Sequence, residues 1–175
     1  MKMENNYWIV DGWLIFKPEF NEELTNYYGI INKYKKIMFS NYKDPSIAIK
    51  TNNKYSNNLI QSKFNQEIFI PLNIKSLNMC CCNNQYLIDN LHNNIEELII
   101  VQTNLNLDNL PNSIKKLHIE DYNKELNNLP NSIEYLKLIN YYLKIKKIPK
   151  NLKTIKCNKK YKYIDDFKNC NVITY

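Results

Sequence analysis

The phrase LPNSI occurs twice in this chain, beginning at Leu110 and again at Leu129, 19 residues later. Related phrases begin at Ile70, Leu91 and Ile148, and they share an apolar first residue and further apolar residues at the fifth, eighth and tenth positions. A period of about 20 residues is typical of solenoids, in which each repeat forms one coil and neighbouring coils share a core. The repeat therefore constrains the architecture before any single residue is interpreted.

Each phrase runs into a short segment of alternating apolar residues, which predicts a strand with alternate side chains in the core. Weaker copies extend the period to both ends, with strands centred near residues 15, 38, 59, 78, 99, 118, 137, 156 and 174. Stacked in register, such strands form one parallel sheet. We therefore expect a mainly β solenoid of about nine short coils with one sheet face, which occupies residues 1–175 as a single domain.

The N-terminal end carries a hairpin signal, because Asp11-Gly12 separates two apolar runs. We expect residues 1–16 to form a hairpin that caps the solenoid. The segment FNEELTNYYGIINKY, which begins at Phe20, is the one stretch where a helical segment is expected. The N-terminal residues otherwise have the pattern of strands and repeat phrases.

At the other end, residues 171–175 (NVITY) are predicted to form the terminal strand, with Ile173 and Tyr175 pointing inward. No hairpin, helix or charged residue follows to protect its edge, and exposed edges recruit other strands. A weak homodimer through this strand is therefore expected.

A second phrase recurs between the strands, and it always places an aromatic residue first: FNEEL at Phe20, FNQEI at Phe64, YNKEL at Tyr122 and YYLKI at Tyr141. The stretch FNQEIFIPLNIKSLNM (residues 64–79) resembles the FNIP repeat, a relative of the leucine-rich repeat found in social amoebae and in giant viruses that infect amoebae. The resemblance implies a leucine-rich-repeat-like fold. Many members also carry an F-box, but the N-terminal residues here lack its helical pattern.

The recurring aromatic residues are predicted to stack inside the solenoid at one corner of each coil, because they keep step with the repeat. The asparagines that follow three of them are expected to hydrogen-bond turn backbone. These asparagines are Asn21, Asn65 and Asn123.

Composition weakens the case for nucleic acid, although the net charge is +7. All 24 basic residues other than histidine are lysines, a bias expected of an AT-rich genome, and arginine, which binds phosphate with two hydrogen bonds, is absent. The charge is uneven: residues 76–114 contain no lysine, whereas residues 135–164 contain ten lysines and no acid. The lysines either solvate the repeat surface or form a basic surface for acidic protein, nucleic acid or anionic lipid.

Cysteine and histidine spacing predicts no metal site, no cofactor and no enzyme. Cys80, Cys81 and Cys82 are adjacent, so their side chains diverge, with Cys81 expected inward and Cys80 or Cys82 outward. Cys157 and Cys170 align with core positions. His92 is expected in a turn and His118 on the outer surface, with no catalytic partner at a suitable spacing. Five cysteines without a disulfide pattern indicate a reducing, intracellular compartment.

No apolar run is long enough for a membrane span, and no signal peptide is recognised. If the source is viral, the host cytoplasm is the expected compartment, with the virion as an alternative. The architecture favours a non-catalytic scaffold that binds a partner protein on the outer face of the sheet. A basic C-terminal surface that binds nucleic acid or anionic surfaces, and a structural component of a viral particle, are the alternatives. The residues expected to bind the partner are Ile99, Val101, His118, Glu120, Tyr135, Lys137, Ile139 and Lys156.

Overall fold

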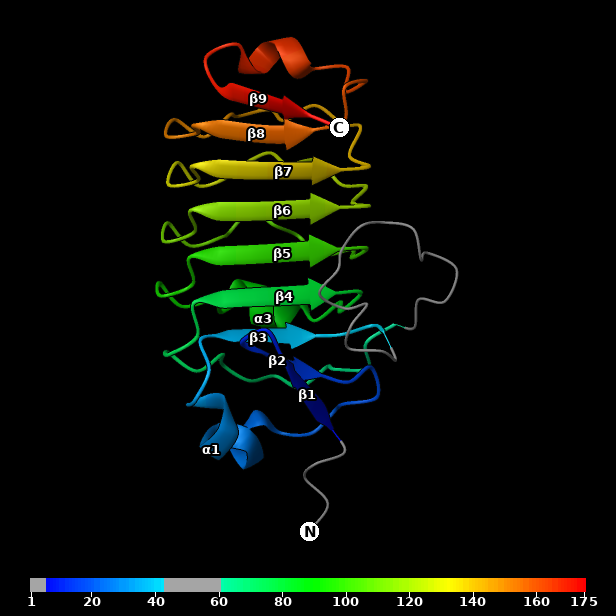
Figure 1. The fold of residues 1–175 in the computed structure, drawn as a ribbon, viewed down its shortest axis with the longest axis vertical. Coiled ribbons are helices and arrows are strands. Elements are labelled where there is room, and N and C mark those ends of the chain that lie inside the picture. Colours follow the sequence, from blue (N-terminus) through cyan, green and yellow to red (C-terminus); the bar gives the residue numbers. More distant parts are fainter. Residues whose placement is uncertain (1–5, 43–60) are drawn as a thin grey trace.

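The computed structural model describes residues 6–42 and 61–175, which build a solenoid on one nine-stranded sheet (Figure 1). The strands are β1 (Tyr7–Val10), β2 (Trp13–Phe16), β3 (Lys36–Phe39), β4 (Ser76–Cys80), β5 (Glu97–Val101), β6 (Lys116–Glu120), β7 (Tyr135–Ile139), β8 (Thr154–Cys157) and β9 (Asn171–Thr174). The short helical elements are η1 (Leu24–Tyr27), α1 (Tyr28–Ile31), α3 (Gln85–Asp89) and η3 (Ile164–Phe167).

Strands β2 to β9 run parallel, and each pairs with the next strand in the sequence, so that they stack like rungs in Figure 1. The predicted alternation is confirmed, because one apolar residue in each strand from β2 to β8 points into the core and is fully buried. These residues are Leu14, Ile37, Leu77, Leu98, Leu117, Leu136 and Ile155. The mainly β, solenoid-like fold expected from the repeat is therefore present.

One predicted strand, centred near residue 59, lies outside the described residues. In the sheet, β3 pairs directly with β4, with Ile37 opposite Leu77. The two residues are 40 apart in the sequence, about twice the repeat period, so these two neighbouring rungs are joined by a double-length connection.

The N-terminal hairpin is confirmed. Strand β1 pairs antiparallel with β2, and Val10 lies opposite Trp13 across the turn. Asp11 and Gly12 between them have φ values of 50° and 78°. Two successive residues with positive φ are typical of a type I′ turn, whose twist matches that of the flanking strands. The helical segment expected after Phe20 is present as η1 and α1.

Aromatic rings stack inside the solenoid, as predicted. The rings of Phe20 and Phe64 have their centroids 5.5 Å apart, and those of Tyr122 and Tyr141 are 6.4 Å apart. All four side chains are buried. Phe39 from β3 adds to the first stack, 4.2 Å from Phe64. The aromatic residues of the second phrase therefore serve as core residues.

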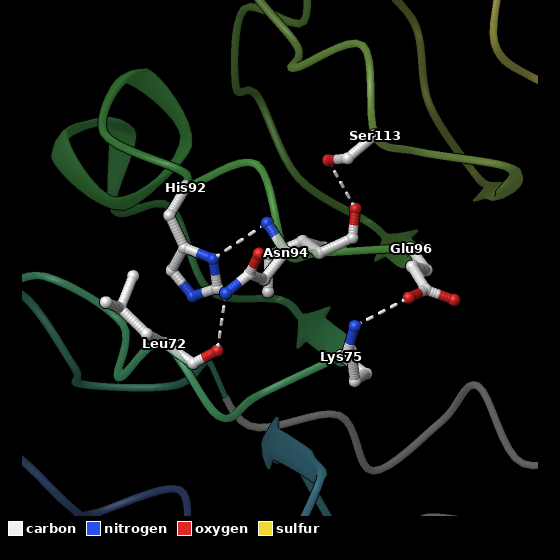
Figure 2. Close-up of polar contacts among 7 residues, drawn as sticks. Leu72, Lys75, His92, Asn94, Glu96 and Ser113 are labelled. Carbon is white, nitrogen blue, oxygen red and sulfur yellow. Dashed lines mark hydrogen bonds and ion pairs between the residues drawn. The ribbon is translucent and has the colours of Figure 1, made fainter.

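Side chains of one coil repeatedly bond the backbone of its neighbour. Of the three asparagines expected to bond turn backbone, Asn21 does so: its Oδ1 accepts a hydrogen bond from the Asn65 N–H at 3.1 Å. Figure 2 shows the same principle near β5, where Asn94 Nδ2 donates to the Leu72 carbonyl at 3.0 Å and Ser113 Oγ donates to the backbone of the preceding coil. These bonds satisfy backbone N–H and carbonyl groups that the short turns leave free.

A polar ladder follows the ends of strands β4 to β7. The first residue after each of these strands has a φ near +50°, and Asp121 in this column accepts hydrogen bonds from Gln102 Nε2 at 3.0 Å and Asn140 Nδ2 at 2.7 Å. Left-handed backbone is costly for residues other than glycine, although Asn and Asp tolerate it best. Side-chain bonds between coils offset that cost. The residues of this ladder are Cys81, Gln102, Asp121 and Asn140.

The cysteine triplet differs from the prediction that Cys81 points inward. Cys81 stands in the polar ladder and contacts the side chain of Asn41, whereas Cys82 belongs to the main core and Cys80 lies on the outer side of β4. The left-handed turn at Cys81 breaks the alternation on which the prediction relied. All three are buried, and all five cysteines, which lie in the described part, are free thiols. Cys157 is a core residue, as expected, whereas Cys170 is only partly buried and packs against the core.

The prediction that Ile173 and Tyr175 point inward is wrong by one residue. Val172 lies opposite the inward Ile155, and Ile173 lies opposite the outward Lys156. Ile155 and Val172 are 17 residues apart, whereas Leu136 and Ile155 are 19 apart, so the last coil is shorter than the alignment assumed. A one-residue slip exchanges the two faces of a strand.

Candidate protein-binding face

The outward residues of β5 to β8 form one surface, which we call the sheet face. All eight residues expected to contact a partner lie on it, because they alternate with the inward residues of the same strands. The register arranges them in rows across neighbouring strands. One row is Ile99, His118, Lys137 and Lys156, a second is Val101, Glu120 and Ile139, and a third contains Tyr135.

The second of these rows is buried. Val101, Glu120 and Ile139 expose 3%, 4% and 9% of their surface, whereas the other five residues are partly exposed. Val101 packs with Met38 and Cys80 in a small apolar cluster on the outer side of the sheet. Its apolar character is therefore explained by packing and not by partner binding alone. The reachable part of the sheet face is the row of Ile99 and the row of Tyr135.

These two rows enclose a shallow pit of about 300 Å³. Its walls are Ile99, His118 and Lys137 on one side and Glu97, Lys116 and Tyr135 on the other. Sequence reasoning missed Glu97 and Lys116, although each precedes a predicted residue by two positions and so points to the same face. The pit combines one aliphatic and one aromatic side chain with charged groups of both signs.

His118 and Glu120 form a buried polar pair beside the pit. His118 Nε2 lies 3.4 Å from Glu120 Oε2, and neither atom has a well-aligned hydrogen bond. Burial lowers the pKa of His118, and this effect outweighs the raising influence of Glu120. Burial therefore favours the uncharged imidazole, in which the contact with Glu120 is a polar contact and not an ion pair. His118 points outward as predicted but is mostly buried rather than freely exposed.

Lys137 is half-buried, and burial is the main reason why its pKa is lowered. Glu120 has a smaller, raising effect on this pKa, and Lys156 a smaller, lowering one. None of the ion pairs formed within residues 6–42 and 61–175 involves Lys116, Lys137 or Lys156. Three basic side chains of the sheet face therefore lie without a carboxylate partner in this part of the chain.

The other predicted features are not part of the sheet face. His92 lies in a turn, as expected, where its Nε2 is 3.1 Å from the Pro71 carbonyl oxygen. Its Nδ1 accepts a hydrogen bond from the Asn94 N–H (Figure 2). In the described residues no three His, Cys, Asp or Glu side chains converge as metal ligands would. None of the helices described is both long and apolar enough to cross a bilayer.

A second surface, on the side of the solenoid, was not foreseen from the sequence. Tyr28, Phe69 and Leu72 expose 41%, 61% and 68% of their surface beside a groove of about 560 Å³ that also includes His92. The signal was present in the phrase FIPL, where Phe69 and Leu72 flank the two residues that match the repeat. The groove is more apolar than the pit on the sheet face, but it lacks unpaired charges of the kind found there.

Comparison with known proteins gives one family match, over residues 102–141, to the family described as FNIP Repeat. The matched residues include β6 and β7, whose strands line the pit. The crystal structure of CroV588, a circular leucine-rich-repeat protein from a giant virus, is similar with a TM-score of 0.49 and 22% identity. The similarity covers 89% of this chain and 29% of that one, so this chain spans less than a third of its length.

No curated protein matches the chain. The family match covers two consecutive coils of a continuous parallel stack, and the same register continues through the strands on either side. Residues 102–141 therefore match the FNIP repeat, and they lie within a mainly β, solenoid-like fold.

Proposed function

We propose that this protein is a non-catalytic scaffold that binds a partner protein on the sheet face. The observation that carries the proposal is the pit between the row of Ile99 and the row of Tyr135, where partly exposed apolar side chains stand among charged ones. Aromatic and aliphatic anchors in a charged surround are typical of protein-binding surfaces. The repeat architecture agrees with this, since solenoids generally serve as interaction scaffolds.

The proposal is tested by the double variant Ile99→Asp with Tyr135→Ala. Both side chains point away from the main core, and Ile99 only borders the small outer cluster, so circular dichroism should stay native and the unfolding midpoint should fall only slightly. Tyr142→Ala is the matched control, because Tyr142 is 68% exposed and lies beyond the end of β7. Affinity purification with quantitative mass spectrometry should recover the same partner with the parent and the control, and lose it with the double variant. Equal recovery with all three proteins would refute the sheet face as the binding surface.

A second candidate function is binding to nucleic acid or anionic surfaces through the lysines of residues 135–164. Three of the ten lysines in that region form ion pairs with carboxylates of neighbouring coils, so fewer of its positive charges are available to a ligand. The pairs are Lys144 with Asp166, Lys146 with Glu125, and Lys153 with Glu134. A salt titration separates the two functions, since binding to phosphates weakens steeply as salt rises.

A further inference from the structure

Some lysines of the described residues have a carboxylate partner, and those of the sheet face do not. Away from the sheet face, Lys75 lies 2.7 Å from Glu96 and Lys146 lies 2.7 Å from Glu125, in each case with the acid in a neighbouring coil (Figure 2 shows the first pair). On the sheet face, Lys116, Lys137 and Lys156 have no such partner among the described residues. Four lysines outside the sheet face thus have a carboxylate of another coil as partner, whereas Lys116, Lys137 and Lys156 on it lie available to a ligand.

These three lysines come from consecutive strands. Lys137 lies directly opposite Lys156 on β8 and His118 on β6, and Lys116 lies opposite Tyr135 on β7. Neighbouring strands are about 4.8 Å apart, so the three ammonium groups can reach one short segment of a ligand. Lys137 is in addition half-buried. A partly desolvated ammonium group without a counter-charge gains more from an incoming carboxylate than a fully hydrated one does.

Neither of the two acids beside these lysines forms an ion pair with them. Glu97 Oε2 accepts a hydrogen bond from Ser76 Oγ at 2.8 Å, and Glu120 is buried against His118. The charge that a ligand meets on the β7 and β8 side of the pit is therefore positive. Only at the opposite wall does Glu97 present a negative group.

Resting on the proposed function, the geometry points to an acidic segment of the partner protein as the occupant of the sheet face. Its carboxylates lie against Lys137 and Lys156, and one apolar or aromatic side chain enters the pit between Ile99 and Tyr135. A neutral or basic residue lies next to Glu97. A phosphate backbone fits less well, because its charges follow one another without a break and one of them would meet Glu97.

The inference is tested by selecting binders from a random peptide library displayed on phage, with the intact chain as bait. We expect enrichment of peptides that are rich in Asp and Glu and contain an apolar or aromatic residue. The double variant Lys137→Gln with Lys156→Gln should bind these peptides at least about tenfold more weakly, as expected when a partly buried charge pair is lost. Lys147→Gln with Lys150→Gln is the control, because it removes the same charge from exposed residues between β7 and β8, and it should change binding less than about twofold.

The outcomes separate this inference from the proposed function. If neutral peptides are enriched and their binding is lost only in the Ile99→Asp, Tyr135→Ala variant, the sheet face binds protein but the acidic specificity is wrong. If the peptides bind elsewhere, or none is enriched, both proposals fail. If a single-stranded oligonucleotide displaces the acidic peptides at lower concentration than the peptides themselves require, the lysines belong to a nucleic-acid site and the inference is overturned.

Discussion

Leu117 and Lys116 are neighbours in β6, yet Leu117 is fully buried between Leu98 of β5 and Leu136 of β7, whereas Lys116 is exposed. A solenoid has no other source of long-range contacts than the coils on either side. A single inward leucine therefore holds three coils together, while its neighbour contributes only to the surface.

Replacing Leu117 by alanine should destabilise the protein by about 2–5 kcal/mol, because the change removes buried methyl groups and leaves a cavity between two coils. Lys116→Ala is the matched control, and it should alter the free energy of unfolding by less than about 0.5 kcal/mol. Urea denaturation of both variants measures the difference. Similar midpoints for the two variants would contradict the register of β6.

Ser132→Ala tests the hydrogen bonds between coils. Ser132 Oγ donates to the Ile114 carbonyl at 2.8 Å, and Ser113 makes the equivalent bond one coil earlier. Removing the hydroxyl leaves a carbonyl of the buried Ile114 without this donor, at an expected cost of about 1–3 kcal/mol. Thermal unfolding should show a lower midpoint. A variant as stable as the parent would mean that water replaces the hydroxyl.

His118 should make stability depend on pH. Burial is the largest influence on the pKa of His118 in the folded protein, and it lowers this pKa. The positive charge of Lys137 also lowers the pKa, whereas Glu120 and Glu97 raise it. A histidine with a lowered pKa favours the folded state when neutral, so this contribution is present above the ordinary pKa of about 6.5 and is lost as pH falls through that value. His118→Gln should therefore lose less stability than the parent between about pH 7 and pH 5. Both proteins retain His92, whose pKa is also lowered, so only the difference between them is informative. The reverse order would mean that an ion pair with Glu120 outweighs burial.

Much of the fold could be predicted because the repeat period and the alternation of apolar residues act together. Leu98, Leu117 and Leu136 occupy the same inward position in successive coils, and one phrase is enough to align them. The errors occur where a coil departs from the common length. The last coil is shorter, which reversed Ile173 and Tyr175, and the connection between β3 and β4 is twice the usual length.

The sequence predicted which residues lie on the sheet face, but not how deeply their side chains are buried. Alternation places Val101 and Ile139 outward, yet it cannot show that these positions are buried, because the packing of Val101 involves residues of β2, β3 and β4 as well as β5. The left-handed backbone at Cys81 also could not be predicted from its own strand. Cysteine carries no preference for positive φ, and only the Asp and Asn in the same column of later coils indicate such a conformation. The left-handed conformation at Cys81 is therefore indicated by the equivalent residues of later coils and not by the sequence of β4 itself.

Strand β9 provides the last prediction, because in the described structure it pairs on one side only, with β8. Ile173 and Tyr175 expose 40% and 45% of their surface there. An open edge with apolar residues recruits a second strand, and two copies can pair through this edge about a two-fold axis. The lysines of the preceding coil would approach each other in such a dimer, so association should be weak and should strengthen as salt screens the repulsion. Ile173→Lys should prevent it, since a charged residue at an edge opposes pairing, whereas Tyr142→Ala, away from β9, should not. Sedimentation velocity at increasing salt measures both, and a parent protein that stays monomeric at high concentration and high salt would rule out the pairing.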